Sequence, residues 1–97
     1  MGETFWEDHL HAANARKARI RFVRAELQVG LITLSQALAD PGVQSITVGR
    51  VIQWLPRWGP HRTDEMLQAL DWPINPNRLC GDLTERQRAL LEQAVKR

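Results

Sequence analysis

The stretch TVGRVIQWLPRWGPHR, residues 47–62, decides the fold of this chain. It begins with a helix N-cap residue, Thr47, and continues with apolar residues at the i, i+3, i+4, i+7 spacing of one helix face: Val48, Val51, Ile52 and Leu55. Pro56 cannot continue that helix, so residues 57–59 are expected to turn the chain. Pro60 suits the first turn of a further helix, whose inward face is expected to hold Met66, Leu67 and Leu70. The stretch therefore predicts two short helices joined by a tight turn.

Helical signals also dominate on both sides of this stretch. Residues 9–30 are expected to form one long basic helix that Gly30 ends. Capping boxes at Thr33 and Thr84 predict a short helix over residues 34–39 and a final helix whose buried residues are Leu83, Leu90, Leu91 and Ala94. Strand patterns are short and isolated. The expected fold class is therefore all-α, a single domain over residues 1–97 in which a long N-terminal helix packs on a core of short helices, residues 33–97.

Two connections are also expected. Asp40-Pro41-Gly42 stops the short second helix and turns the chain. Pro73 and Pro76 exclude a helix over residues 72–77, which predicts an extended connector there.

The long helix carries three stripes when its residues are placed about 100° apart. One stripe is apolar, with Ala15, Ala18, Phe22, Ala25 and Val29. A second apolar face lies nearly opposite, with Ile20, Val23 and Leu27, and a basic stripe between them holds Lys17, Arg21 and Arg24. A helix with two apolar faces is expected to be partly embraced by other elements.

Composition sets the class of protein. The chain has 97 residues, of which 43% are hydrophobic and 25% charged, which is typical of one soluble globular domain with little room for a deep catalytic cleft. No apolar run is long enough to span a membrane, and the acidic residues near the N-terminus argue against a secretory signal. The single cysteine, Cys80, cannot form an internal disulfide, which fits a reducing, cytoplasmic setting.

Charge is distributed unevenly along the chain. The net charge is +2, yet five cations and no acid lie between residues 14 and 24: Arg16, Lys17, Arg19, Arg21 and Arg24. Eleven of the 13 cations are arginine, the better bidentate ligand for phosphate. This pattern favours a polyanionic partner, and a solvated helix face is the alternative reading of the same run.

The turn at residues 57–62 is the strongest candidate site. The amide groups at the start of the helix after the turn lack helical acceptors and carry partial positive charge, which suits a phosphate. Arg57 and Arg62 flank this point, and His61 is a further donor. Pro60 removes one amide donor, however. The remaining donors still predict contacts with the phosphates of a nucleic-acid backbone. The alternative is an ordinary helix–helix turn that bears surface arginines.

The aromatic residues have different expected roles. Trp54 and Trp72 lie beside apolar helical positions and are expected in the core. For Trp58, three roles stay open: insertion into a minor groove or stacking on a base, anchoring of a protein contact, and packing on its own turn. Phe5 and Trp6 precede the long helix, where residues 1–8 are a candidate arm, a staple onto the core or a docking element.

Other reactive side chains carry little signal. His9 and His11 are two residues apart on a helix and point in different directions, so no shared metal site is expected. Cys80 is expected to be an unreactive thiol, and Asp64 with Glu65 to complement the helix dipole. The sequence therefore indicates no catalytic residue, metal or cofactor, and a protein that is not an enzyme.

The order of these elements resembles the actinobacterial integration host factor family of mycobacteria and streptomycetes. That family's turn has the form LPGVGKVRA, and this chain has LPRWGPHRT over residues 55–63. Its SRRVRGLG connector is similar to PNRLCG over residues 76–81, and its last helix with Q-x-x-x-L to QRALL over residues 87–91. The Arg16 to Leu27 helix and the GLITL step at residues 30–34 extend the resemblance, which covers roughly residue 14 to the C-terminus.

The resemblance implies a helix–two-turn–helix core and binding of double-stranded DNA through backbone and minor groove. By position, Leu55, Pro56, Gly59 and Arg62 match the turn, and Arg78 and Gly81 match the basic connector. Four departures from the family pattern affect its turn glycine and its basic residues, with Arg57 for a glycine, Pro60 for a lysine, and Asn77 and Cys80 for arginines. Each lost phosphate contact is expected to weaken binding and its salt dependence.

The sequence thus supports two hypotheses. The first is a nucleoid-type DNA-binding protein of an actinobacterium or actinophage, with contacts from Lys17, Arg21, Arg24, Arg57, Trp58, Gly59, His61, Arg62 and Arg78. It would compact or bend DNA, or assist site-specific recombination, and RNA binding is a variant of this reading. The second is a protein-interaction module on the same scaffold, favoured by the near-neutral charge and extra tryptophans.

Overall fold

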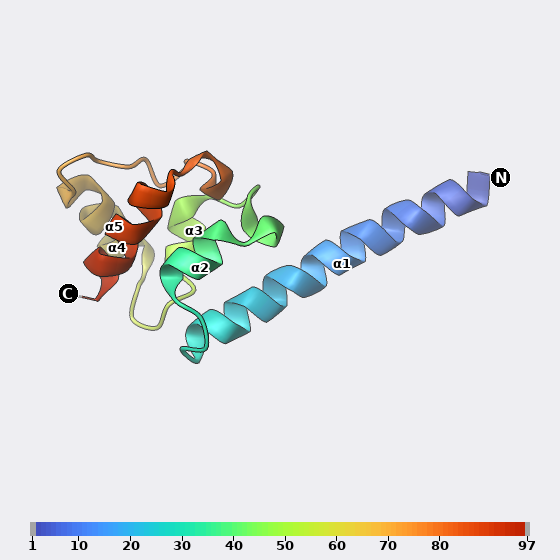
Figure 1. Cartoon of the computed structure of the whole chain (residues 1–97), viewed down its shortest axis with the longest axis horizontal. Helices are drawn as coiled ribbons and strands as arrows, with labels where there is room; N and C mark the ends of the chain where they lie inside the picture. Colours follow the sequence, from blue (N-terminus) through green and yellow to red (C-terminus); the bar gives the residue numbers. More distant parts are fainter. Residues whose placement is uncertain (1, 97) are drawn as a thin grey trace.

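The computed structural model describes the backbone of residues 2–96 and the side chains of residues 14–96. In this range the secondary structure is helical (Figure 1), with α1 Gly2–Gln28, α2 Leu34–Ala39, η1 Pro41–Val43, α3 Val48–Ile52, α4 Pro60–Ala69, η2 Cys80–Asp82 and α5 Glu85–Val95. The β pairing described is an isolated bridge between Thr47 and Leu79. The all-α prediction is therefore confirmed, and α1 projects from a body of short helices (Figure 1).

Two findings concern the N-terminal part of the chain. The predicted helix start at residue 9 is wrong, because α1 begins at Gly2 and residues 2–8 continue the helix instead of forming a separate arm. The predictions for the side chains of Phe5, Trp6, His9 and His11 lie outside the residues whose side chains are described. Over the described part of the chain, no helix has both the length and the apolar character needed to cross a bilayer.

Gly30 ends α1, as the sequence predicts. Its φ of 80° lies in the left-handed region, which a residue without a Cβ adopts at little cost. The N–H of Gly30 donates to Leu27 O (3.3 Å), and the N–H of Leu31 donates to Glu26 O (2.9 Å). These two bonds form a Schellman motif, which satisfies carbonyls that a helix end would otherwise leave without donors.

Both capping boxes are confirmed. Thr33 Oγ1 accepts from the N–H of Gln36 (3.1 Å), and Gln36 Oε1 accepts from the N–H of Thr33 (2.8 Å). Thr84 and Gln87 make the same reciprocal pair at 3.1 and 2.9 Å. Local side-chain chemistry thus fixes where α2 and α5 begin.

The start of α3 is held differently from the prediction. Thr47 occupies the N-cap position but makes no side-chain cap hydrogen bond. The connector supplies acceptors instead, because the N–H of Val48 donates to Arg78 O (2.8 Å) and that of Gly49 to Pro76 O (3.0 Å). A Cβ on Gly49 would lie 3.0 Å from Pro76 Cβ, which is a tight contact, so this close approach favours glycine. The connector therefore braces α3. It is not extended over its whole predicted range, because the N–H of Arg78 donates to Asn75 O (3.0 Å) and closes a turn at residues 76–77.

The core lies among α2, α3, α4 and α5 at the base of α1. Trp54 is buried, as predicted, and the other buried hydrophobic residues include Val23, Leu27, Leu38, Val51, Ile52, Leu67, Ile74, Leu83 and Leu91. Met66 and Leu70 pack against this core half-buried.

Two core predictions are wrong. Trp72 is 81% exposed, because Ile74 takes the inward position after α4 and its N–H donates to Leu67 O (3.2 Å). Leu90 is 43% exposed, because its neighbour Leu91 points into the core and adjacent residues on a helix point about 100° apart.

The expectation that α1 is covered on two faces is also wrong. Val23 and Leu27 are buried against the body, while Phe22 is 56% and Val29 71% exposed on the other apolar stripe. The three alanines of that stripe are exposed as well. The short helices after α1 fold back onto one side of it (Figure 1). The opposite apolar stripe is left in solvent.

Candidate nucleic-acid interface

The turn between α3 and α4 reverses the chain at Arg57. Its φ is 73°, and Arg57 is the one non-glycine residue with a positive φ in the described range. The left-handed region crowds the Cβ of an L-residue, so Arg57 occupies a backbone position that favours glycine.

Trp58 packs back onto the protein. Its side chain is half-buried against the core, and the Arg62 guanidinium carbon lies 4.2 Å from the centre of its ring. Arg62 Nη1 also donates to Arg57 O (3.3 Å). Of the three roles left open for Trp58, the described conformation is packing on its own turn, which holds Arg62 in place by a cation–π contact.

The start of α4 presents free amide groups. The N–H of Thr63 donates to Gly59 O (3.0 Å), which is the first helical hydrogen bond, and Pro60 has no N–H. The amides of Gly59, His61 and Arg62 have no acceptor among the described residues. Together with the helix dipole they form a weakly positive end beside the two arginines of the turn.

Carboxylates lie near this site but do not neutralise its arginines. Within the described residues, neither Arg57 nor Arg62 has a carboxylate partner within 4.0 Å. Asp64 is expected on the other flank of α4, about 160° around the helix from Arg62. His61 differs, since its Nε2 lies 3.0 Å from Glu65 Oε1, so part of its capacity to bind an anion is already used.

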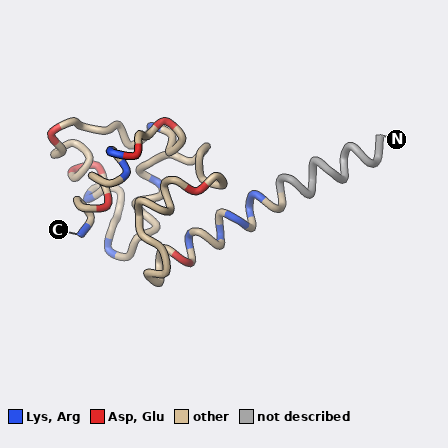
Figure 2. Tube along the Cα trace, viewed as in Figure 1, with Lys and Arg blue, Asp and Glu red and all other residues tan. Residues whose placement is uncertain are grey.

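The basic stripe of α1 begins near the turn. A groove of about 400 Å³ is lined by Leu27 and Gly30 from the end of α1 and by Pro56 and Trp58 from the turn, among others. Lys17, Arg21 and Arg24 are all exposed on α1. Figure 2 shows basic positions repeated along the described part of this projecting helix.

Arg19, another cation of α1, forms an ion pair with the body. Its Nη2 lies 2.6 Å from Asp40 Oδ2. Because Arg19 donates this hydrogen bond, and the N–H of Gly42 donates another, the pKa of Asp40 lies below its ordinary value. Arg19 therefore anchors α1 to the segment after α2.

Arg78 is not brought to the turn. The connector that carries it crosses the upper edge of the body in Figure 1, whereas the turn before α4 lies at the lower edge. Arg78 Nη2 donates to Asp82 O (3.1 Å).

Sequence reasoning missed Arg50, which is exposed on α3. It lies two residues after Val48, whose N–H donates to Arg78 O. The sequence feature that could have identified Arg50 is a single cation among apolar residues in a short helix.

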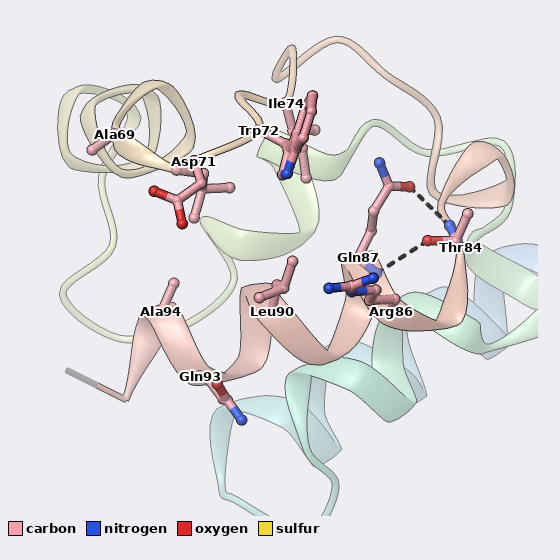
Figure 3. Close-up of a pocket in the computed structure, with 11 residues that line it drawn as sticks. Ala69, Asp71, Trp72, Ile74, Thr84, Arg86, Gln87, Leu90, Gln93 and Ala94 are labelled. Carbon is pink, nitrogen blue, oxygen red and sulfur yellow. Dashed lines mark hydrogen bonds between the residues drawn. The ribbon is translucent and has the colours of Figure 1, made fainter.

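A second hollow lies on another part of the body. The groove between the end of α4 and α5 has a volume of about 710 Å³, and Figure 3 shows Trp72, Ile74, Leu90 and Ala94 among its lining residues. Asp71 and Arg86 lie at its edge (Figure 3). The two mispredicted side chains, Trp72 and Leu90, thus line this groove.

Cys80 is not a candidate nucleophile. Its side chain is fully buried, and burial raises the pKa of the thiol to about 12. A thiol with that pKa carries almost no thiolate near neutral pH. In the described part of the chain, no three residues among His, Cys, Asp and Glu are grouped as metal ligands would be.

Comparison with known proteins gives no relative. No family model matches the chain, and no curated protein or solved structure matches it significantly. The resemblance to the actinobacterial integration host factor family therefore stays a prediction from the sequence.

Proposed function

We propose that this protein binds double-stranded DNA through the phosphate backbone, as an architectural protein of the nucleoid with little sequence preference. The observation that carries the proposal is the turn before α4, where Arg57 and Arg62 lack carboxylate partners among the described residues and flank free amides. Guanidinium and amide donors suit phosphate oxygens. Contacts of this kind position a protein on a duplex without reading its bases.

The basic stripe of α1 extends this surface. Lys17, Arg21 and Arg24 are exposed along about 10 Å of helix, at 1.5 Å per residue. A duplex gripped at the turn would have further phosphates within reach of a helix that leads away from it. The left-handed backbone at Arg57 is consistent with the resemblance, because the family pattern has glycine there.

The test is a salt series of duplex-binding titrations with Arg57→Ala and Arg62→Ala combined. Each lost phosphate contact lowers the slope of log affinity against log salt by about 0.9, so the double variant should lose about 2 from the slope, equally for unrelated sequences. Unchanged affinity at low salt would reject the site.

Arg86→Ala is the matched control for the single variant Arg57→Ala. It removes the same charge from an exposed position at the start of α5. The later turns of α5 line the groove beside the turn, from Glu92 onward, so Arg86 is separated from that groove by about 9 Å of helix. Arg86→Ala should therefore leave duplex affinity close to that of the parent protein.

A protein-interaction role is the second candidate. The groove with Trp72 at its edge favours it, since exposed tryptophans beside apolar pockets are common binding hot spots. A protein partner that is stoichiometric, survives nuclease treatment and is lost with Trp72→Ala would support this role. Equal recovery with Trp72→Ala would exclude the groove.

A further inference from the structure

The exposed apolar stripe of α1 has no partner in the described structure. We call it the α1 seam, and it consists of Ala15, Ala18, Phe22, Ala25 and Val29. Phe22 and Val29 are large hydrophobic residues with more than half of their surface in solvent. Arg19 lies over the ring of Phe22 with its guanidinium carbon 5.7 Å from the ring centre, but it leaves most of the ring uncovered.

The spacing of the α1 seam is that of a helix pair. Its residues are separated by three, four, three and four positions, which is the a and d pattern of a heptad repeat. A helix that packs on a globular core needs a wider apolar face, with e or g positions added. A strict a/d seam matches a second helix wound around the first.

The body does not block this face. Val23 and Leu27 attach α1 to the core, and they lie about 140° around the helix from the middle of the seam, at b and f positions that point away from a partner helix. Arg19, which binds Asp40 of the body, is nearer, at an e position about 80° from the middle of the seam, and so lies at its edge and not within it. A second helix can therefore lie on the seam while α1 keeps its contacts with its own body.

The charges beside the seam indicate which helix fits. Arg21 occupies a g position and Glu26 the e position of the next heptad, five residues later. In a parallel, in-register pair, the g residue of one helix faces the e residue five positions on in the other. Neither residue has an ion-pair partner within 4.0 Å among the described residues. In a pair of identical helices, Arg21 of each chain faces Glu26 of the other chain, so symmetry forms this ion pair twice.

We propose that α1 pairs with α1 of a second copy of this chain in a parallel, in-register, two-stranded coiled coil. The apolar pattern stops at Ala15, because Asp8 and His11 hold the preceding a and d positions. Five seam residues per chain bury less than the ~1,200 Å² of a stable interface, so the pair is weak and depends on concentration. It places both bodies, and both turns before α4, at the same end of the pair.

The experiment is disulfide formation in the full chain carrying Ala18→Cys, without DNA. Residue 18 is at a d position, so its two copies face each other across a parallel, in-register pair, within the Cβ separation of a disulfide. Arg16→Cys is the matched control, exposed on the same helix but pointing away from the seam. The buried Cys80 takes no part. Because of the raised effective concentration, Ala18→Cys should form dimers at least about tenfold faster than Arg16→Cys.

Two further variants test the seam and its charges. Phe22→Glu, added to Ala18→Cys, should reduce the rate to that of the control. Glu26→Arg should slow the reaction by placing like charges together, and Arg21→Glu added to Glu26→Arg should restore the rate.

Equal rates for Ala18→Cys and Arg16→Cys would overturn the proposal, as would an antiparallel pair, in which the two introduced thiols are separated along the helices. A protein that stays monomeric alone and uses the seam only with a different protein would also overturn it. Because no duplex is present, the result is independent of the proposed DNA binding.

Discussion

Replacement of Arg57 separates what the backbone requires from what the guanidinium contributes. Arg57→Gly and Arg57→Ala both remove the charged group, but only glycine accepts the φ of 73° without a steric cost. An L-residue such as alanine in the left-handed region lowers the stability by roughly 1–2 kcal/mol. Glycine avoids this cost but lowers the stability by about 0.5–1 kcal/mol, because it loses more conformational freedom on folding. Arg57→Gly should therefore be about 1 kcal/mol more stable than Arg57→Ala.

Thermal unfolding measures this difference. In a domain of this size about 1 kcal/mol corresponds to about 4–8 °C in Tm, which a melt followed by circular dichroism resolves. Gly59→Ala is the control, because φ is −82° there and no atom lies within 4 Å of an added Cβ. Its stability should stay within about 0.5 kcal/mol of the parent protein.

Duplex binding by the same two variants completes the test. If the guanidinium meets a phosphate, both variants should lose affinity equally, and the salt slope of each should fall by about 0.9. An Arg57→Ala protein as stable as Arg57→Gly would refute the left-handed turn. Arg57→Gly with the parent's duplex affinity would refute the contact while leaving the turn geometry standing.

Two other predictions concern stability. Asp40 has a lowered pKa because Arg19 donates a hydrogen bond to it, so its contribution is present above its ordinary value of 3.8 and is lost as the pH falls through the folded-state pKa. Asp40→Asn should thus lower the free energy of unfolding by about 1 kcal/mol near neutral pH and by less in acid, as measured by urea denaturation; a pH-independent difference would contradict this. Thr63→Val should raise the free energy of unfolding by about 1 kcal/mol, because the buried Thr63 hydroxyl has no hydrogen-bond partner among the described residues, and a lower urea midpoint would contradict that.

The candidate site was predictable only where it is continuous in sequence. The run from Arg57 to Arg62 includes the helix start that presents free amides, so those groups stay together in the fold. Arg78 is separated from the turn because the connector crosses α3 on its way to α5 (Figure 1).

The sequence by itself determined where α1 ends and where α2, α4 and α5 begin. Thr33 with Gln36, Thr84 with Gln87, Gly30 and Pro60 act on backbone groups a few residues away, so their effects hold whatever surrounds them. Only the tertiary structure decided which apolar side chains are covered. Ile74 is buried instead of Trp72, and of the two apolar faces of α1 only the one with Val23 is covered, while the one with Phe22 is exposed. Burial depends on the element that packs there from elsewhere in the chain, which periodicity along one helix does not specify.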